Sequence, residues 1–243
     1  MNVAILAGGR GRRLGLLTES TQKAVLCFNG NPIISHVVDT ALSEMFVGEI
    51  IVLTGYRSND IHQVLHERYP GEIRTGKIGI LDFPNVQGTL SRFTSSLPQL
   101  HASNGWCVCG IDSLVPQTVF HRFCSYVVSH KDEVILSFSP RLEVAPTHKI
   151  GCIQADNLIM LTSHEMAVAP PQLDSLWGTD VGIRFFPIQE LQRMSEKEFP
   201  NGTNIPFYIQ ELLASRKTVR AFFFEENWKH FASIEDFYGF HVP

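Results

Sequence analysis

The first fourteen residues constrain the fold of this chain more than any other segment. Residues 2–7 are almost entirely apolar and predict a short buried strand, and residues 8–13 then hold three glycines and three arginines. Glycine lets the backbone approach a bulky ligand, so that several N–H groups point at one set of oxygens. Arginine adds planar donors that match phosphate. A tight turn with solvated arginines is the alternative, but this density of both residues directly after a strand favours a phosphate site.

Two common phosphate-binding motifs do not fit this loop. The dinucleotide-binding fingerprint requires glycine or alanine at its third small position. Counted from Gly9 and Gly11, that position is Leu14. The P-loop ends in Gly-Lys-Ser/Thr, and no such run follows Gly8 or Gly9. The loop therefore belongs to a phosphate site of another kind.

The first half of the chain alternates apolar strands with amphipathic helices. This alternation predicts a mostly parallel sheet with right-handed crossovers. Asn31 is expected to be the N-cap of a helix, with Pro32 as its first residue. The further expected elements are strands at 49–53, 77–81 and 105–109 and helices at 59–69 and 89–97.

The second half is less regular and predicts a smaller mixed or antiparallel region. No internal repeat or low-complexity tract divides the chain, so one α/β domain is expected. Residues 163–177, with Ala169-Pro170-Pro171, are expected to form a loop. The other expected elements are strands at 134–138, 148–153, 158–161, 181–186 and 219–224, a turn at 155–157 and a helix at 205–214.

Composition excludes some classes of protein. With 243 residues, of which 44% are hydrophobic, the chain can bury a full core. Its formal net charge of −4 argues against a nucleic-acid-binding protein that relies on a basic surface. Against this acidic background, Arg10, Arg12, Arg13 and Lys23 form a local basic centre that would attract a polyanion such as a nucleotide.

The cysteines and the apolar runs bear on localisation. An odd, scattered set of five cysteines is not a disulfide framework, which fits a reducing cytoplasm. Cys107 and Cys109 alternate along an apolar strand, and burial is favoured over a metal pair there. The N-terminus has no signal-peptide pattern, and no apolar run reaches the length of a membrane span. We expect a cytoplasmic protein with no membrane contact.

Three N-terminal motifs in order resemble a known family. They are Leu6–Leu14, Thr21–Leu26 and Asn29–Ile34. Together they resemble the sugar-phosphate nucleotidyltransferases, the nucleoside-diphosphate-sugar pyrophosphorylase-like enzymes, which include phosphocholine cytidylyltransferase-like members. The family pattern is a Leu-Ala-Gly-Gly-x-Gly-x-Arg-Leu loop, a Pro-Lys-Pro/Ala-Leu segment and a Gly-x-Pro-Leu/Ile turn. Gln22 stands where the family has proline, and we expect this change to affect backbone rigidity more than chemistry.

The resemblance implies a fold and a reaction. The fold would be a three-layer Rossmann-like α/β domain spanning residues 1–243, with a nucleotide-binding half at 1–130 and an acceptor-binding half at 131–243. The reaction would transfer NMP from an NTP to a sugar 1-phosphate or similar phosphate monoester and release pyrophosphate, as in sugar nucleotide biosynthesis. A divalent cation, Mg²⁺ or Mn²⁺, would be needed. The NTP, the acceptor and the oligomeric state stay open.

The resemblance also implies roles for individual residues. Arg13 would stabilise the leaving pyrophosphate, Lys23 would contact the α-phosphate and Asp112 would hold the metal. Gln87 would read base edges through its amide, although Gln87-Gly88-Thr89 is equally a plausible helix entry. The residues expected to bind the nucleotide are Leu6, Ala7, Gly8, Gly9, Gly11, Arg12, Gln87, Gly88 and Thr89.

The expected metal site departs from the family pattern. The family has a Gly-Asp pair after the strand, whereas here Ile111 separates Gly110 from Asp112; the alternative role of Asp112 is a turn before a helix at Pro116. His230 occupies the position of the second metal-binding aspartate. Because imidazole is a poor magnesium ligand, this favours Mn²⁺. An alternative alignment matches Ser233-Ile234-Glu235-Asp236 to the phosphocholine cytidylyltransferase-like members. The metal-binding aspartate of those members would then correspond to Ala232 here.

One segment in the second half of the chain is expected to border the acceptor. Gly178–Ile183 resembles the Asn-x-Gly-Ile/Val-Tyr strand that borders the acceptor, so Asp180 and Gly182 are expected to bind it. Asp180 could equally be a solvated charge at a strand end. A molybdopterin guanylyltransferase-like enzyme shares the Leu-Ala-Gly-Gly loop but differs in its later motifs. A catalytically impaired nucleotide- or sugar-nucleotide-binding protein of the same fold is the alternative from another class.

Overall fold

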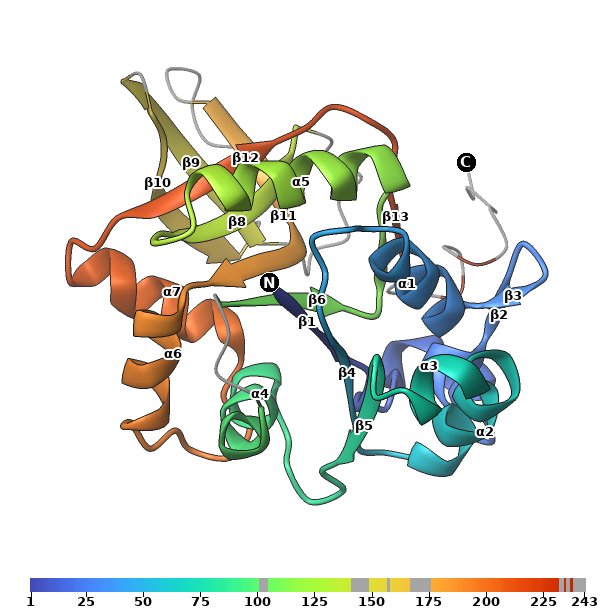
Figure 1. The fold of residues 1–243 in the computed structure, drawn as a ribbon. Coiled ribbons are helices and arrows are strands. Elements are labelled where there is room, and N and C mark those ends of the chain that lie inside the picture. The colour runs from blue at the N-terminus through green and yellow to red at the C-terminus, as the bar shows by residue number, and fades with distance from the viewer. Residues whose placement is uncertain are drawn as a thin grey trace.

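The computed structural model describes residues 1–100, 105–140, 149–156, 158–166, 176–231, 234 and 237, and between residues 149 and 177 it describes the backbone of the strands alone. These residues form three layers, a nine-stranded sheet with helices on both faces (Figure 1). In spatial order the strands are β5 (Ile78–Asp82), β4 (Ile50–Thr54), β1 (Asn2–Leu6), β6 (Trp106–Gly110), β11 (Leu176–Phe186), β8 (Val134–Ser139), β12 (Val219–Phe223), β10 (Leu158–Met166) and β9 (Lys149–Asp156).

The sheet is mostly parallel. Strands β5, β4, β1 and β6 pair in parallel, β8 and β12 continue in the same direction, and β11 runs antiparallel between β6 and β8. The strands β9 and β10 form an antiparallel extension at the far edge. The expected α/β fold, a mostly parallel sheet with a smaller mixed region in the second half, is therefore confirmed.

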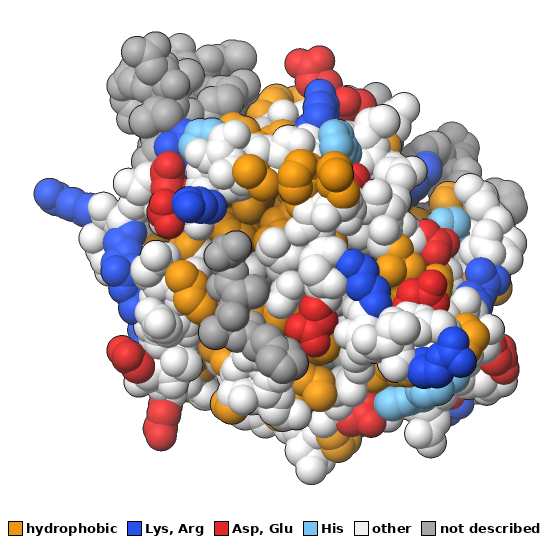
Figure 2. Space-filling view, in the orientation of Figure 1, with side chains coloured by type: hydrophobic (Ala, Val, Ile, Leu, Met, Phe, Trp, Pro, Cys, Tyr) orange, Lys and Arg blue, Asp and Glu red, His pale blue; other side chains and the backbone are white. Residues whose placement is uncertain are grey.

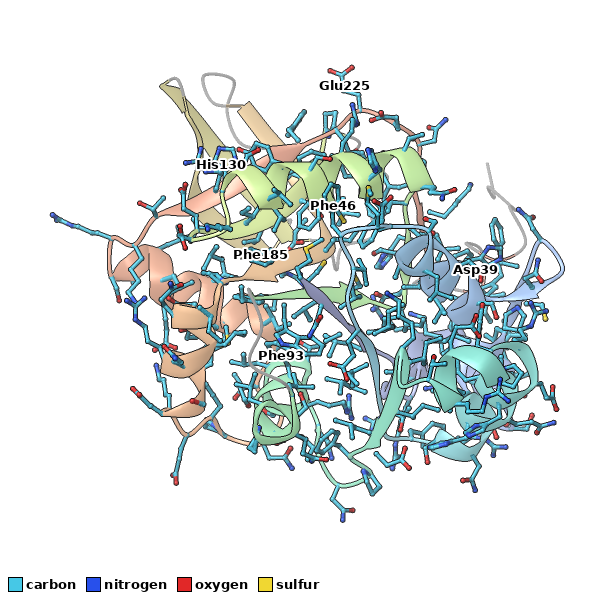
Figure 3. All side chains as sticks on the ribbon, viewed as in Figure 1. Asp39, Phe46, Phe93, His130, Phe185 and Glu225 are labelled. Carbon is cyan, nitrogen blue, oxygen red and sulfur yellow. The ribbon has the colours of Figure 1, made fainter. Side chains whose placement is uncertain are left out.

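Two apolar clusters hold the layers together. On one face, α1 (Ile33–Leu42), α2 (Ser58–Arg68) and α5 (Gln117–Ser129) pack against the sheet, joined by the short α3 (Pro70–Arg74). On the other face lie α4 (Thr89–Ser96), α6 (Ile188–Ser195) and α7 (Ile205–Ala214). Phe185 belongs to the first cluster and Phe93 to the second, and both side chains are fully buried (Figure 3). Cys107 and Cys109 are buried in the first cluster, as expected.

The start of the first helix differs from the expectation. Asn29 and Gly30 both have positive φ, 49° and 78°, which is the geometry of a tight hairpin turn. The hairpin pairs β2 (Cys27–Phe28) with β3 (Asn31–Pro32). The expectation that Asn31 caps the helix was therefore wrong, because the Asn-Gly turn makes residue 31 part of a strand, and the helix begins at Ile33.

The expected loop at 163–177 was also wrong at both ends. The strand β10 continues to Met166 and β11 begins at Leu176, while residues 167–175 and the tip of the 155–157 turn at Asn157 lie outside the described residues. Both strands gain ladder hydrogen bonds from β9, which a reading of local composition does not reveal.

Sheet direction positions the functional site. The parallel strands β1, β4 and β6 end at the same edge, so the segments that follow them meet there. On the face shown in Figure 2, acidic and basic side chains are interspersed and no continuous basic surface appears among the residues drawn. No helix in the described part of the chain is long and apolar enough to cross a membrane.

Candidate active site

The glycine-rich loop leaves β1 at the edge where the parallel strands end. Gly11 adopts φ 65°, a left-handed conformation that favours glycine, and the turn leads into a short 3-10 helix, η1 (Arg12–Thr18). Arg12 and Arg13 in its first turn are exposed. A Cβ added to Gly9 would meet no atom within 4 Å, so open space lies in front of the loop. The loop has the freedom and the charge that an anion site requires.

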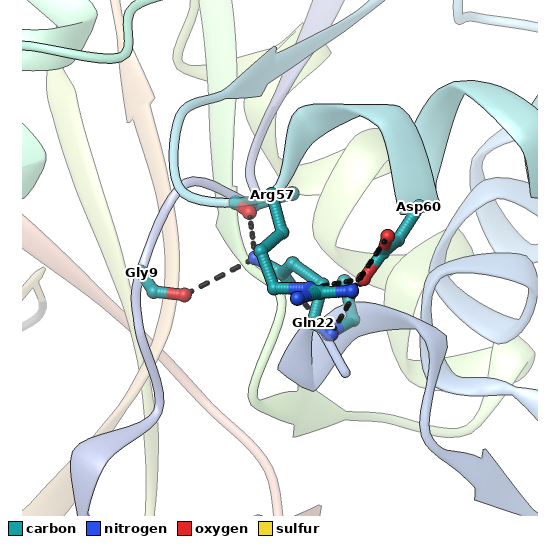
Figure 4. A network of polar contacts seen from close by, with 6 residues as sticks. Gly9, Gln22, Arg57 and Asp60 are labelled. Atoms are coloured by element: carbon teal, nitrogen blue, oxygen red, sulfur yellow. Dashed lines mark hydrogen bonds and ion pairs between the residues drawn. The ribbon is translucent and has the colours of Figure 1, made fainter. Parts of the chain in front are cut away.

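Gln22 ties this loop to the next segment (Figure 4). Its side chain is 1% exposed, and its amide Nε2 donates to the carbonyl oxygens of Ala7 at 2.6 Å and Gly9 at 3.1 Å. Its Oε1 accepts from the backbone N–H of Ala24. Its own backbone N–H donates to Asp60 Oδ2 at 3.0 Å. A proline ring cannot make these bonds, which hold the backbone of the glycine loop and of the following turn in place. The expectation that glutamine here affects rigidity more than chemistry stays a prediction.

Lys23 follows directly in a second 3-10 turn, η2 (Lys23–Val25). Its side chain is largely buried, and Nζ lies 3.2 Å from Asp112 Oδ2. Because both groups are charged, the contact fixes the ammonium at the carboxyl end of β6. The structure thus brings together two predicted site residues that are 89 positions apart.

Ile111, the extra residue before Asp112, packs into the hydrophobic core. Ile111 is buried in the first apolar cluster, and Asp112 then turns toward the cavity with 34% of its side chain exposed. Burial alone would raise the pKa of the Asp112 carboxyl, but the charges of Lys23 and His230 outweigh it and hold the pKa below its usual range.

His230 reaches the same place through strand pairing. The short β13 (Lys229–His230) pairs with β7 (Ser113–Leu114), so that His230 lies opposite Ser113, and Phe231 N donates to Asp112 O at 2.8 Å. The His230 Nδ1 lies 3.3 Å from Ser113 Oγ. The second predicted metal position is therefore beside the first. Residues 232, 233, 235 and 236 of the alternative alignment lie outside the described residues.

Three adjoining cavities surround these residues. The Lys23 cavity, about 330 Å³, lies between the glycine loop and Asp112. The Arg184 cavity, about 750 Å³, extends from Arg13 and Asp112 under α7. The Tyr56 cavity, about 280 Å³, lies beside the glycine loop. Twelve predicted site residues line at least one of the first two: Leu6, Gly9, Gly11, Arg12, Arg13, Lys23, Gly88, Thr89, Asp112, Asp180, Gly182 and His230.

The predicted base-reading segment borders the Tyr56 cavity. Gln87 and Gly88 line it, and the Gln87 side chain is exposed. Gly88 has φ 81°, and a Cβ there would meet Thr203 O at 2.3 Å, so only glycine fits against the neighbouring loop. The backbone N–H of Gln87 donates to Asn201 Oδ1 at 2.7 Å. This segment is thus held by residues 201–204 through its backbone, while the side-chain amide of Gln87 is exposed to the cavity and could bind a ligand.

The predicted acceptor residues lie on the floor of the Arg184 cavity. The Asp180 carboxylate, 1% exposed, accepts from Gly182 N at 2.8 Å and from Arg184 Nη2 at 2.7 Å. Gly182 has φ 89° at an irregularity in the β11–β8 pairing. The alternative of a solvated charge at a strand end is excluded by this burial. Whether Asp180 or Gly182 touches an acceptor stays a prediction.

Three residues of the site were not assigned to it from the sequence. They are Gln22, Arg92 and Arg184. Arg92 falls on the apolar face of α4, between the buried Leu90 and Phe93, and a lone cation on such a face is a usable signal. Arg184 stands where the family strand has tyrosine, which is a second usable signal.

The fold and this constellation are those of a nucleotidyltransferase domain. Residues 3–165, about two thirds of the chain, match the MobA-like NTP transferase domain family, and the chain belongs to that family.

Two curated relatives match part of the chain. The chain is 34% identical over 71 residues to the UTP–glucose-1-phosphate uridylyltransferase AglF of Haloferax volcanii, and 34% identical over 85 residues to a 2-aminoethylphosphonate cytidylyltransferase of Lancefieldella rimae. These matches cover 29% and 35% of this chain. They span only 29% and 34% of the relatives' lengths.

Solved structures share the fold over nearly the whole chain. An inositol-1-phosphate CTP transferase from T. maritima superposes with a TM-score of 0.74 at 16% identity, covering 97% of this chain and 90% of that one. A UDP-glucose pyrophosphorylase complexed with UDP-glucose gives 0.77 at 15% identity, covering 97% and 95%. At these identities the likeness establishes the fold.

Asp112 and His230 are the two side chains at the expected position of a divalent ion. Asp112 and His230 line one cavity, and no group of three or more His, Cys, Asp or Glu side chains suited to a metal occurs in the described part of the chain. Two protein donors suit an ion that takes its remaining ligands from substrate phosphates and water, as magnesium commonly does. The residues therefore fit a metal shared with a nucleotide.

Proposed function

We propose that this protein transfers NMP from an NTP to a sugar 1-phosphate or a similar phosphate monoester and releases pyrophosphate. The observation that carries the proposal is the Lys23–Asp112 contact, which fixes a cation and a carboxylate in one cavity with the glycine loop. Positioning and charge neutralisation are what phosphoryl and nucleotidyl transfer ask of a protein.

The proposed chemistry is an in-line displacement. An oxygen of the acceptor phosphate attacks the α-phosphorus, the bond to the β-phosphate oxygen breaks, and pyrophosphate leaves. Lys23 would neutralise charge that builds on the α-phosphate, since its ammonium is already held in place by Asp112. Arg13, which borders both the Lys23 and Arg184 cavities, would stabilise the pyrophosphate. The loop N–H groups from Gly8 to Arg12 would bind the other phosphate oxygens.

The divalent ion of the proposal is Mg²⁺ or Mn²⁺. Asp112 would hold it, with His230 as the second protein donor. Bound there, the ion would neutralise phosphate oxygens as a Lewis acid. Imidazole favours Mn²⁺ over Mg²⁺ relative to a second carboxylate.

The two halves of the chain would divide the substrates between them. Residues 1–130 supply the glycine loop, Lys23 and Asp112, whereas the Arg184 cavity is built largely from residues after 130. We therefore propose a single domain over residues 1–243, with the nucleotide in the first half and the acceptor near Asp180 and Gly182 in the second. A volume of about 750 Å³ suits an acceptor the size of a sugar phosphate.

The test is pyrophosphate release from the purified protein. Four NTPs are each combined with glucose 1-phosphate, inositol 1-phosphate, phosphocholine and 2-aminoethylphosphonate, with Mg²⁺ or Mn²⁺. The relatives' names motivate three of these acceptors, and the resemblance to phosphocholine cytidylyltransferase-like enzymes motivates phosphocholine. We expect turnover with at least one pair and loss of turnover in Lys23→Ala. NTP binding without pyrophosphate release from any pair would favour a catalytically impaired binding protein.

A further inference from the structure

Arg92 differs from the other buried arginines. Among the described residues three arginines are buried: Arg92, Arg184 and Arg220. Arg184 pairs with Asp180, and Arg220 forms a two-pronged pair with Glu133. Arg92, 7% exposed, pairs with no carboxylate of the described chain. A buried cation without a counter-charge is costly, so its retention needs a reason.

The guanidinium of Arg92 is only partly bonded. Its Nη2 donates to the carbonyl of Val86, and its buried Nε has no hydrogen-bond partner among the described residues. Burial also lowers the pKa of the Arg92 guanidinium, which reflects the same lack of a compensating charge. At least one donor of Arg92 therefore has no acceptor within the part of the chain that the structure describes.

Two glycines make room for this side chain. A Cβ added to Gly8 would lie 2.4 Å from Arg92 Cζ, and one added to Gly55 would lie 2.8 Å from Arg92 Nη2. The guanidinium therefore lies against the backbone at the ends of β1 and β4. Gly8, which is predicted to allow close approach of a nucleotide, is also needed to leave room for Arg92.

The position of the Arg92 guanidinium indicates which part of a bound nucleotide would lie next to it. Arg92 lines both the Tyr56 cavity and the Lys23 cavity, whereas its close neighbours Gly8 and Val86 line the Tyr56 cavity and not the Lys23 cavity. The Tyr56 cavity lies to the side of the Lys23–Asp112 contact, on the flank that carries Gln87. The glycine loop borders both cavities, but the Nη2 end of the guanidinium is bonded to Val86, which directly precedes the base-reading candidate Gln87. A nucleotide with its α-phosphate beside Lys23 and its base beside Gln87 would therefore place the base against this end of Arg92.

We propose that Arg92 donates a hydrogen bond to a carbonyl oxygen on the edge of the nucleotide's base, an inference that rests on the proposed function. Cytosine, uracil and guanine each carry a carbonyl oxygen, whereas adenine carries only nitrogen acceptors. Arginine is the common partner of such an oxygen because its planar fork presents fixed donors. The protein thus selects nucleotides whose base has a carbonyl and discriminates against ATP.

The experiment measures equilibrium binding of ATP, CTP, GTP and UTP to the full-length protein by calorimetry. The variant Arg92→Met removes the donors at similar length, and Arg220→Met is the matched control, since it removes another buried arginine away from the cavities. For the unmodified protein we expect ATP to bind most weakly. In Arg92→Met the best nucleotide should bind roughly tenfold to a hundredfold more weakly, the range for a hydrogen bond to a charged donor. The affinity for ATP should change by less than about threefold, because adenine has no carbonyl oxygen to lose contact with Arg92.

The outcomes separate the inference from the function on which it rests. Equal loss for all four nucleotides would overturn the base contact, because a phosphate contact or a packing role for the Val86 segment predicts that result. Unchanged binding in Arg92→Met would overturn it as well. If the unmodified protein binds no nucleotide, the proposed function fails with it. Should Arg92→Met not fold, Arg92→Lys keeps the charge but not the fork, and must still weaken the best nucleotide more than ATP.

Discussion

Lys23 Nζ lies 3.2 Å from Asp112 Oδ2, so two residues 89 positions apart form one charged unit in the cavity beside the glycine loop. Neither group moves freely, because Lys23 is buried in a 3-10 turn and Asp112 follows a core strand. A cation held in advance stabilises developing charge without reorganisation.

This arrangement predicts that Lys23→Ala and Arg13→Ala each abolish most of the turnover while the fold is retained. Removing one preorganised charge typically costs about 3 kcal/mol, or on the order of a hundredfold in rate. Lys197→Ala is the control, since Lys197 pairs with Glu211 at the surface. Steady-state pyrophosphate release and circular dichroism are the measurements. Full activity in both site variants would remove the Lys23 cavity from consideration.

A second prediction concerns Gln22 as a residue that positions Lys23 and the glycine loop. In Gln22→Ala the carbonyls of Ala7 and Gly9 lose their donor, which should reduce unfolding free energy by about 1–3 kcal/mol. Gln22→Glu should cost more, because a buried carboxylate would then face two carbonyl oxygens. Urea denaturation measures both.

The kinetic readout separates positioning from stability alone. If Gln22 positions Lys23, kcat in Gln22→Ala should fall at temperatures where the variant is fully folded, whereas the control Gln63→Ala, at an exposed helix position, should not change it. A Gln22→Ala enzyme with unchanged kcat below its unfolding transition would limit Gln22 to a structural role.

The sequence predicted the fold and the central site residues for a physical reason. The buried strand and the glycine loop are contiguous, and Asp112 lies just past a strand with Ile111 between them, so local pattern locates them. Lys23 and the role of Asp112 came from the resemblance to the family motifs. Gln22 and Arg92 could not be assigned in this way, because their partners are backbone carbonyls and glycines brought near only by the folded sheet. The Asn29-Gly30 pair is a recognisable hairpin-turn signal. The Asn31-Pro32 pair that follows it resembles a helix start, and this led to the wrong helix boundary.

A third prediction concerns the floor of the Arg184 cavity. Arg184→Met would leave the Asp180 carboxylate buried without its cation, and breaking such a pair typically costs about 3–5 kcal/mol. Arg220→Met should cost less, since its partner Glu133 is 28% exposed and can be hydrated. Urea denaturation compares the two variants. Equal losses would mean that Asp180 finds other compensation.

The Asp180–Arg184 pair also allows a test of acceptor binding. The double variant Asp180→Asn with Arg184→Met removes both charges and should recover most of the stability lost in Arg184→Met. If the Arg184 cavity binds the acceptor, this double variant should raise the acceptor KM at least several-fold and leave the NTP KM nearly unchanged. An increase in the NTP KM alone would place the acceptor elsewhere.

The last prediction concerns the divalent ion. Asp112 and His230 border one cavity, with the backbone of Phe231 bonded to Asp112 so that their spacing is held by main-chain contacts. Activity should be lost in EDTA, be restored by Mn²⁺ more than by Mg²⁺, and be absent in Asp112→Ala, because one carboxylate and one imidazole favour a softer ion. His230→Asp should raise Mg²⁺-supported turnover by supplying a second hard oxygen ligand. His230→Ala is the matched control, since it removes the imidazole without adding a carboxylate and should lower Mn²⁺-supported turnover. If Mg²⁺ already supports the full rate and both His230 variants match the unmodified protein, His230 does not contact the metal and Asp112 holds it with substrate oxygens and water.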